Sequence, residues 1–260
     1  MKMNSRQSWY CRLTATAITA ICLLSVFPVL SAAPEAGPAT ELNADVITYS
    51  AGTGVITATG GLKMTQGATV MTGDAGEYNV KEKSAVVTGN VKVVKDSGTL
   101  TASEVESLDN MTRFVAIGNV LLVHTSGSAA GPRMEYVPSS RYAKVTGGAR
   151  LVNRDAVITA SLVEAFFSED RATANGNVHI VSEARQLDAV SDHAIYTGLN
   201  GKNGRAELTG NVRAVQGGAV LTGNHVLLYM DDSAVNTQGR SKLVMQPKQA
   251  EKQEPRKDKP

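Results

Sequence analysis

Thr88-Gly89-Asn90-Val91 is a short motif that recurs along this chain at a nearly constant spacing. Close copies stand at 117–120, 175–178 and 209–212, and looser copies stand at 59–62, 146–149 and 238–241. The second residues of these motifs are Gly60, Gly89, Gly118, Gly147, Gly176, Gly210 and Gly239, at intervals of 29 residues except for one interval of 34. Seven units with one period indicate a repeat architecture.

Apolar residues occupy every second position on both sides of the first six glycines, whereas Thr237 and Ser241 flank Gly239. A period of two over about nine residues predicts a strand with one apolar face. The residues expected to line the interior on that face are Val87, Val91, Val93, Ala116, Val120, Leu122, Val145, Leu151, Ala174, Val178, Ile180, Leu208 and Val212.

The glycine of each motif has the same parity as these apolar columns, so we expect it to face the interior as well. A glycine inside a strand marks a bend or a bulge, and the Asn or Gly that follows it in most copies tolerates unusual backbone angles. Each strand is therefore predicted to crease at its glycine, and seven creases in register make one continuous fold line.

A second set of strands alternates with the glycine strands on the same period. Its centres are small residues, namely Ala44, Gly73, Ala102, Gly131, Ala160, Ala189 and Gly223. The apolar positions then change parity, as between Ala102 and Val105, which predicts a β-bulge in this set. Short polar connections favour antiparallel hairpins, and the five extra residues of the long interval are placed between Tyr196 and Arg205. The predicted fold is all-β: a repeat-built antiparallel sheet of about fourteen strands, creased into a trough.

The two ends of the chain differ from the repeats. Residues 1–33 have the basic, apolar and small-residue parts of a secretory signal peptide, with an uncleaved membrane anchor as the alternative. Residues 34–39 form a linker, 40–245 the repeat domain, and 246–260 a basic tail too polar to order itself. An exported protein in the periplasm is expected.

Bulk composition excludes several kinds of chemistry. Both cysteines, Cys11 and Cys22, lie in the leader, so the mature chain has no thiol chemistry and no disulfide. The net charge of +2 is too small to indicate a nucleic-acid partner. The histidines, His124, His179, His193 and His225, lack the spacing of metal ligands. No catalytic constellation, metal site or cofactor site is predicted.

The features that carry a family resemblance are the export leader, the recurring T-G-N-V strands, the L-T-A or M-T-G-D strands between them, and the lack of an outer-membrane barrel after them. In these features the chain resembles the LptA/OstA family of periplasmic lipopolysaccharide carriers over roughly residues 40–245. The resemblance implies a non-enzymatic, semi-closed β-jellyroll whose apolar trough holds lipid A acyl chains. It also implies open edge strands that join head to tail with like chains and with related inner-membrane and outer-membrane partners. The chain departs from the family in its greater length and unusually regular period.

Two interpretations of the apolar columns remain open. Removing a methylene from water is worth about 0.8 kcal/mol, so a dozen methylenes of one acyl chain offer about 10 kcal/mol before entropy costs. Alternatively, the columns pack against one another, as in a structural repeat protein of the cell envelope. An enzymatic parallel β-helix is disfavoured by the hairpin turns.

Two charged columns accompany the apolar ones. The basic column consists of Lys63, Lys92, Arg150 and Arg213, which are candidate contacts for lipid phosphates at the rim of the trough. The acidic column consists of Glu77, Glu106, Glu135 and Glu164. The alternative is that the two columns oppose each other and stabilise strand pairing and solubility, each pair weakly.

Overall fold

The computed structural model describes residues 40–95, 97–109, 112–125, 127–153, 156–198, 204–229, 235–237 and 239–245. The predicted signal peptide, linker and basic tail lie outside these residues. The described residues form one sheet of sixteen strands and a single 3-10 turn, η3 (Phe167–Glu169). No helix among them is long and apolar enough to span a membrane.

The strands fall into two alternating sets. The glycine strands are β3 (Val55–Gln66), β5 (Ser84–Lys95), β7 (Arg113–His124), β9 (Tyr142–Asn153), β11 (Arg171–Ser182) and β13 (Arg205–Gln216). The intervening strands are β4 (Thr69–Asn79), β6 (Gly98–Leu108), β8 (Gly127–Val137), β10 (Val157–Phe166), β12 (Leu187–Thr197) and β14 (Ala219–Tyr229). Four short strands lie at the two ends of the sheet: β1 (Thr40–Asn43), β2 (Val46–Ser50), β15 (Val235–Thr237) and β16 (Lys242–Met245).

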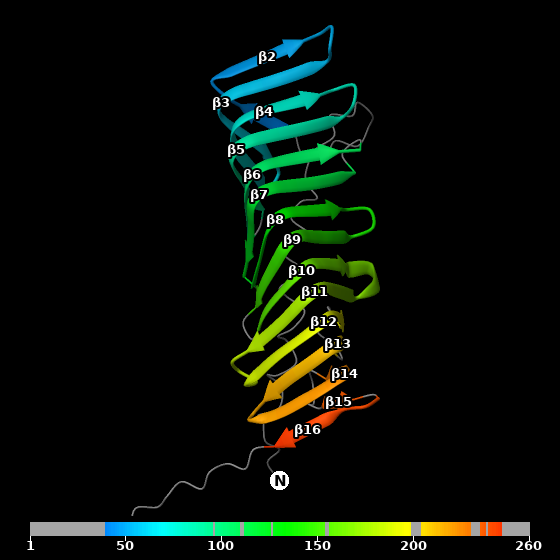
Figure 1. Ribbon diagram of the computed structural model, residues 1–260. Coiled ribbons are helices and arrows are strands. Elements are labelled where there is room, and N and C mark those ends of the chain that lie inside the picture. The colour runs from blue at the N-terminus through cyan, green and yellow to red at the C-terminus, as the bar shows by residue number, and fades with distance from the viewer. Residues whose placement is uncertain are drawn as a thin grey trace, which may run out of the picture.

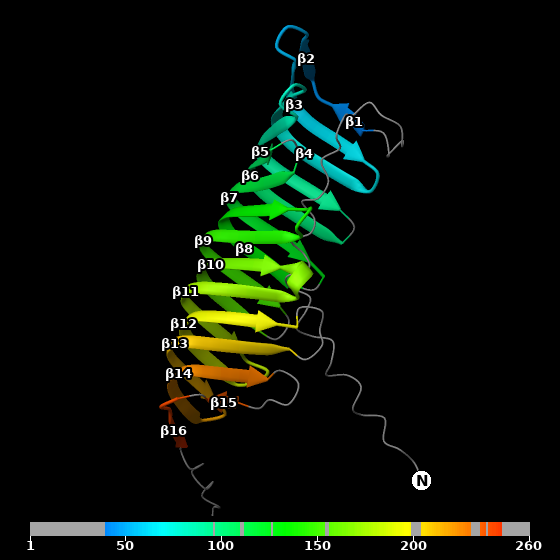
Figure 2. The same ribbon diagram turned by 90° about the vertical axis from the view of Figure 1, so that its right-hand side faces the viewer.

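Every neighbouring pair of strands is antiparallel, and from β3 to β14 their order in the sheet is their order in the sequence. Figures 1 and 2 show the resulting elongated stack, with β2 at one end and β16 at the other. β1 and β2 both pair with β3, and β15 and β16 both pair with β14. Each short pair is thus one repeat strand interrupted at its bend, so the sheet contains the fourteen predicted repeat strands.

The predicted crease lies at the motif glycines. Gly89 and Asn90 have φ angles of 76° and 49°, and the other five long glycine strands also have positive φ at both positions. Positive φ is accessible to glycine without steric cost and to asparagine more readily than to other side chains. The repeated Gly-Asn pair therefore encodes a local backbone bend, and the sheet folds along it.

The predicted bulge in the intervening strands is wrong in location. In the β5–β6 pair, Thr88 pairs with Glu104 and Val91 pairs with Ala102, so the glycine strand has one residue more at the bend. The same excess occurs in the β4–β5 pair. The extra residue therefore belongs to the glycine strand, because only its Gly-Asn pair readily takes positive φ. The intervening strand changes parity because its two bend residues both face outward.

The motif glycine does not face the interior as predicted. A Cβ built on Gly118 would lie 2.5 Å from Ser103 Oγ and 2.7 Å from Ser103 Cβ, and Ser103 is an exposed residue at the bend of β6. The positive φ of 78° turns the Cβ direction out of the normal alternation of the strand. We call Ser103 and its equivalents the corner residues: Asp45, Asp74, Ser103, Pro132, Ser161 and Asp192.

Asparagine side chains form cross-strand hydrogen bonds at the creases of Gly89 and Gly210. Asn90 Nδ2 donates to Asp74 Oδ2 at 3.0 Å, and Asn211 Nδ2 donates to Asp192 Oδ2 at 2.8 Å. The asparagine that tolerates the bend also pairs with the adjacent corner residue, so one motif provides both the backbone geometry and a cross-strand contact.

The five extra residues of the long repeat are divided between two turns, which corrects their placement between Tyr196 and Arg205. The turn from β11 to β12 spans residues 183–186, whereas the turn from β3 to β4 spans only 67–68. The turn from β12 to β13 spans 198–204, whereas the turn from β4 to β5 spans 80–83. The bend of β12 consequently lies at Asp192, and Ser191 takes the inner place predicted for Ala189.

Candidate functional site

The creases divide the sheet into two walls. For β5 and β6, the first wall contains residues 91–95 and 98–102, and the second wall contains 84–88 and 104–108. The inner face of each wall carries the buried apolar columns. The lip of a wall is the line of hairpin turns farthest from the crease, and the two lips lie at opposite ends of every long strand.

The predicted lining residues lie together on the inner faces. Twelve of the thirteen are at most 8% exposed, and Ile180 is partly buried against the same cluster. The cluster extends without a break from Ala58 on β3 to Leu228 on β14. The pattern of alternate positions therefore located the interior correctly.

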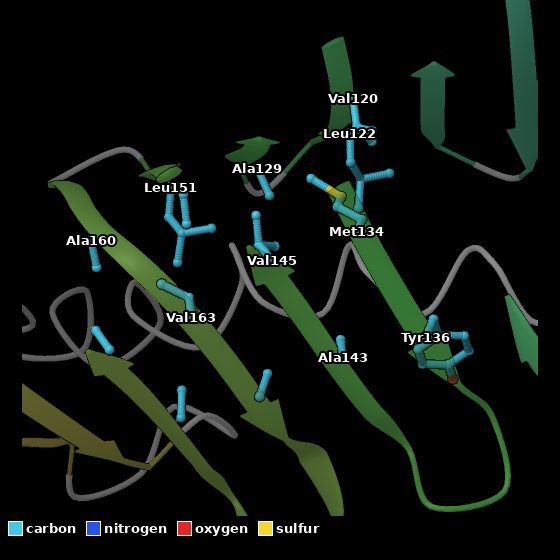
Figure 3. Close-up of a cluster of buried hydrophobic side chains, with 14 of the residues drawn as sticks. Val120, Leu122, Ala129, Met134, Tyr136, Ala143, Val145, Leu151, Ala160 and Val163 are labelled. Carbon is cyan, nitrogen blue, oxygen red and sulfur yellow. The ribbon is translucent and has the colours of Figure 1, made fainter. Parts of the chain in front are cut away.

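Side chains from both walls meet in this interior. Figure 3 shows Met134 of the second wall beside Leu122 of the first wall, with Val120 close to both. All three are at most 1% exposed. The lining combines long side chains with many alanines, such as Ala129 and Ala143 in the same view. Apart from Ser191, the inner columns between the lips carry apolar side chains, so few polar groups would require one particular ligand shape.

At both ends of the sheet, residues of the inner columns are exposed. On β2, Ile47 is 49% and Tyr49 is 61% exposed, and on β16, Leu243 is 54% and Met245 is 72% exposed. Within the stack, the equivalent places are covered, since Val105 and Tyr136 are at most 3% exposed. The interior lining therefore continues to both edges of the sheet, where one side of the terminal strand lacks a neighbour.

The basic column does not lie at the rim of the interior. Lys92 is exposed between the buried Val91 and Val93, so it lies in the middle of the first wall on its outer face. Lys63, Arg150 and Arg213 are exposed at equivalent places. The sequence correctly placed this column on the opposite face from the apolar columns. Its predicted position at the rim was wrong, because the distance from a strand residue to the lip depends on the folded sheet.

The acidic column lies on the outer face of the second wall, so it does not oppose the basic column. Lys92 pairs in register with Thr72 and Thr101, whereas Glu106 pairs with Val86 and Val115. Burial raises the pKa of Glu104, and a hydrogen bond to Glu106 together with the charge of that carboxylate raises it further. The two charged columns therefore lie on the outer faces of different walls.

An aromatic group on the outer face of the second wall was not found from the sequence. Tyr142 and Phe166 have ring centroids 5.2 Å apart, and the Arg171 guanidinium lies 4.3 Å from the Phe166 centroid. Tyr142 Oη donates a 2.5 Å hydrogen bond to Glu164, and burial together with this carboxylate raises the pKa of Tyr142. The cross-strand register aligns these residues, and only the long-range pairing could have revealed it.

The histidines are spread over different strands. His225 Nε2 lies 2.6 Å from Glu207 Oε1, His179 Nε2 lies 3.2 Å from Asp188 Oδ1, and His193 Nδ1 lies 3.0 Å from Asn175 Oδ1. Within the described part of the chain, no three or more His, Cys, Asp or Glu side chains form a group that could hold a metal ion.

A comparison with known protein families finds a match for part of this sheet. Residues 71–171, from β4 to the start of β11, match the family described as LptA/(LptD N-terminal domain) LPS transport protein. The chain is also similar to the crystal structure of LptH from Pseudomonas aeruginosa, described as the LptA-homologous periplasmic component of the conserved lipopolysaccharide transport device. That similarity has 12% sequence identity, covers 81% of this chain and 96% of LptH, and has a TM-score of 0.18.

A TM-score of 0.18 is too low to support an argument about this chain, and no curated protein matches the sequence. The family match rests on the sequence itself and covers three complete creases, at Gly89, Gly118 and Gly147. It agrees with the resemblance seen in the repeats and with the creased antiparallel sheet. Residues 71–171 of this chain are therefore similar to the LptA/(LptD N-terminal domain) family of LPS transport proteins.

Proposed function

We propose that this chain binds lipopolysaccharide and passes it across the periplasm toward the outer membrane, without catalysing a reaction. The observation that carries this proposal is a continuous inner apolar lining that extends to both exposed edges of the sheet. The match of residues 71–171 to LPS transport proteins supports the choice of ligand. The acyl chains of lipid A lie along the inner columns, including Val91, Val120 and Val212.

The energetics favour a ligand of this kind. Each methylene transferred from water into the lining contributes about 0.8 kcal/mol, so one twelve-carbon chain contributes about 10 kcal/mol before entropy costs. Because the lining is uniform from β3 to β14, an acyl chain gains similar stabilisation at each repeat. With a uniform lining, the binding free energy of an acyl chain is similar at every position, which favours movement of the lipid along the molecule.

The exposed edges fit a head-to-tail partner that continues the lining. Inside the sheet, each glycine strand is followed by an intervening strand, with Val93 opposite Leu100 and Val87 opposite Val105. We apply the same register to a joint in which β15 and β16 of one copy lie beside β1 and β2 of the next copy. Leu243 then pairs with Leu42, and Thr237 pairs with Ile47. Addition of a strand to an open edge forms main-chain hydrogen bonds as well as this apolar contact. Related proteins of the inner and outer membranes are the other partners proposed for these edges.

The compartment follows from the predicted leader, residues 1–33, which would export the chain to the periplasm. A soluble bridge between two membranes needs a covered path for acyl chains and partners at both ends. The interior and the two edges supply these two requirements.

Site-specific photo-crosslinking tests the proposal in cells that make lipopolysaccharide. A photoreactive residue replaces Val91, Val120, Val178 or Val212 on the inner face, and Lys92 on the outer face serves as the matched control. The inner positions are expected to capture lipopolysaccharide and position 92 is not. Capture at position 92 alone, or at no inner position, would contradict the proposal.

The alternative function is that of a structural repeat protein of the envelope. Its supporting observation is the low exposure of the lining residues, at most 8% for twelve of thirteen, which also fits a core packed on itself. Such a core excludes lipid at all four inner positions, so the same experiment separates the two functions.

A further inference from the structure

The first lip carries a row of polar side chains on its inner face. Each glycine strand ends two residues beyond the last apolar column, and the inward residues there are Lys95, His124, Ser182 and Gln216. Strand pairing shows that they face inward: Lys95 pairs with Thr69, which is 5% exposed, and Ser182 pairs with Leu187, which is 7% exposed. The apolar interior therefore ends in a polar border.

Ser182 is a buried member of this polar row. The residue is 3% exposed, and its Oγ has no hydrogen-bond partner. A buried hydroxyl without a partner is unfavourable and uncommon in folded proteins. Its position at the end of the apolar column places an unused hydrogen-bonding group beside the interior.

On four of the six long intervening strands the second lip has a hydroxyl-bearing side chain at its inner border, whereas β10 and β14 end their inner columns with Ala165 and Leu228. Tyr78, Ser107, Tyr136 and Tyr196 occupy the last inward place of their intervening strands. Tyr136 is 3% exposed within the core cluster, and Tyr196 packs against that cluster while partly exposed. Tyrosine side chains are suited to a boundary between apolar and polar surroundings, because the ring is apolar and the hydroxyl is polar. Both lips therefore pair an apolar interior with polar ends.

We propose that the polar row of the first lip, Lys95, His124, Ser182 and Gln216, binds the phosphorylated head group of the lipid whose acyl chains occupy the interior. This inference rests on the proposed function and adds the position of the head group. The Lys95 ammonium pairs with phosphate oxygens, and the Ser182 hydroxyl hydrogen-bonds a phosphate or sugar oxygen. The exposed basic column on the outer face, including Lys92, takes no part.

The row also has a spacing suited to passage. Lys95 and His124 lie on β5 and β7, with one strand between them, so their backbones are about 9.6 Å apart. His124 Nε2 lies 2.8 Å from Ser97 Oγ, and Gln216 Nε2 donates to the Arg185 carbonyl oxygen at 3.4 Å. Polar groups thus recur along the lip at the same interval as the lining that holds the acyl chains.

The test compares binding of bisphosphorylated lipid A and of dephosphorylated lipid A to the purified full chain. Lys95→Met keeps the apolar stem and removes the charge, and Lys92→Met is the matched control on the outer face of the same strand. Lys95→Met is expected to weaken binding of the phosphorylated lipid about five- to tenfold and to leave the other lipid unchanged. Lys92→Met is expected to change neither. Equal losses in the two variants, or no loss in Lys95→Met, would overturn the proposal.

Ser182→Ala provides a second readout. Because Ser182 Oγ has no partner in the protein, its removal is expected to leave the Tm unchanged or raised and to weaken lipid A binding about threefold. A lower Tm with unchanged affinity would show a structural role and contradict the proposal. If the unmodified chain binds neither lipid, the proposed function itself fails, whereas equal binding of both lipids by every variant refutes only the head-group site.

Discussion

The side chain of Asp74 occupies the space that a Cβ of Gly89 would enter. The Asp74 Cβ and Cγ both lie 2.6 Å from that position, which is closer than real Cβ contacts allow. The glycine is therefore required twice, once for its positive φ of 76° and once for the close approach of the corner residue. The same relationship recurs at five other creases, whereas a Cβ on Gly239 would meet no atom within 4 Å, so the steric requirement applies to six of the seven motif glycines.

The two requirements at Gly89 can be separated by a double-mutant cycle. Gly89→Ala is expected to lower the free energy of unfolding by about 2 kcal/mol, from backbone strain and overlap together. In an Asp74→Gly background the overlap is gone, so the same change should cost about 1 kcal/mol. Denaturant unfolding of the four proteins measures this coupling, and equal costs in both backgrounds would refute the steric part.

Gly118→Val tests the crease with a larger, β-branched side chain. The Cβ would overlap Ser103 and hold a valine at φ 78°, so we expect a loss of about 3 kcal/mol in unfolding free energy. Gly52→Ala is the control, because no atom lies within 4 Å of its built Cβ. A stable Gly118→Val variant that carries lipid normally would show that the crease does not depend on glycine.

Val120→Thr introduces one hydroxyl into the interior with almost no change in volume. Val120 is 1% exposed, so an unpaired hydroxyl there should cost about 1–2 kcal/mol and weaken acyl-chain binding. Val123→Thr on the same strand is the control, since Val123 is 46% exposed and threonine suits strands. Thermal unfolding and lipid binding are measured for both, and equal effects would place Val120 outside the interior.

Charges at the two edges should prevent head-to-tail association without unfolding the sheet. Ile47→Asp and Leu243→Asp alter side chains that are 49% and 54% exposed, so the Tm should change little. In a joint between copies these carboxylates would be buried in the continued inner columns, opposite Leu42 and Thr237, so association should weaken by at least tenfold. Sedimentation velocity over a range of concentrations provides the measurement, and unchanged association would place the joint elsewhere.

The outer-face pair of Tyr142 and Glu164 predicts a dependence on alkaline pH. Burial and the Glu164 carboxylate raise the pKa of Tyr142. The stability this provides is complete below the unfolded pKa of about 10 and is lost as the pH rises toward the folded pKa. Tyr142→Phe should lose about 1 kcal/mol at pH 7, and its deficit should shrink above about pH 10. Denaturant unfolding as a function of pH checks this, and a constant deficit would contradict it.

Much of the fold can be predicted from the sequence because strand periodicity and glycine placement are local properties. Alternation around Val91 predicted which side chains face inward, and the Gly-Asn pair predicted where the strand bends. The direction of the glycine Cβ was mispredicted because positive φ reverses the simple alternation. The sequence did not predict that the turn at 183–186 is two residues longer than the turn at 67–68. A longer turn shifts the pairing of β11 with β12, and this pairing is known only from the folded sheet.

By itself, the sequence determined the repeat, the antiparallel strands, the inner columns and the resemblance to LPS transport proteins, since each is a pattern of neighbouring residues or of a fixed period. Only the tertiary structure decided which residues lie at the lips and which lie at the edges. Alternation gives Lys95 the parity of Val91 and Val93 and gives Lys92 the opposite parity, but only the folded sheet shows that the inner column ends at Lys95 beside the hairpin turn. That position arises because parity, the bend and the strand length act together, and they are combined only when the sheet folds.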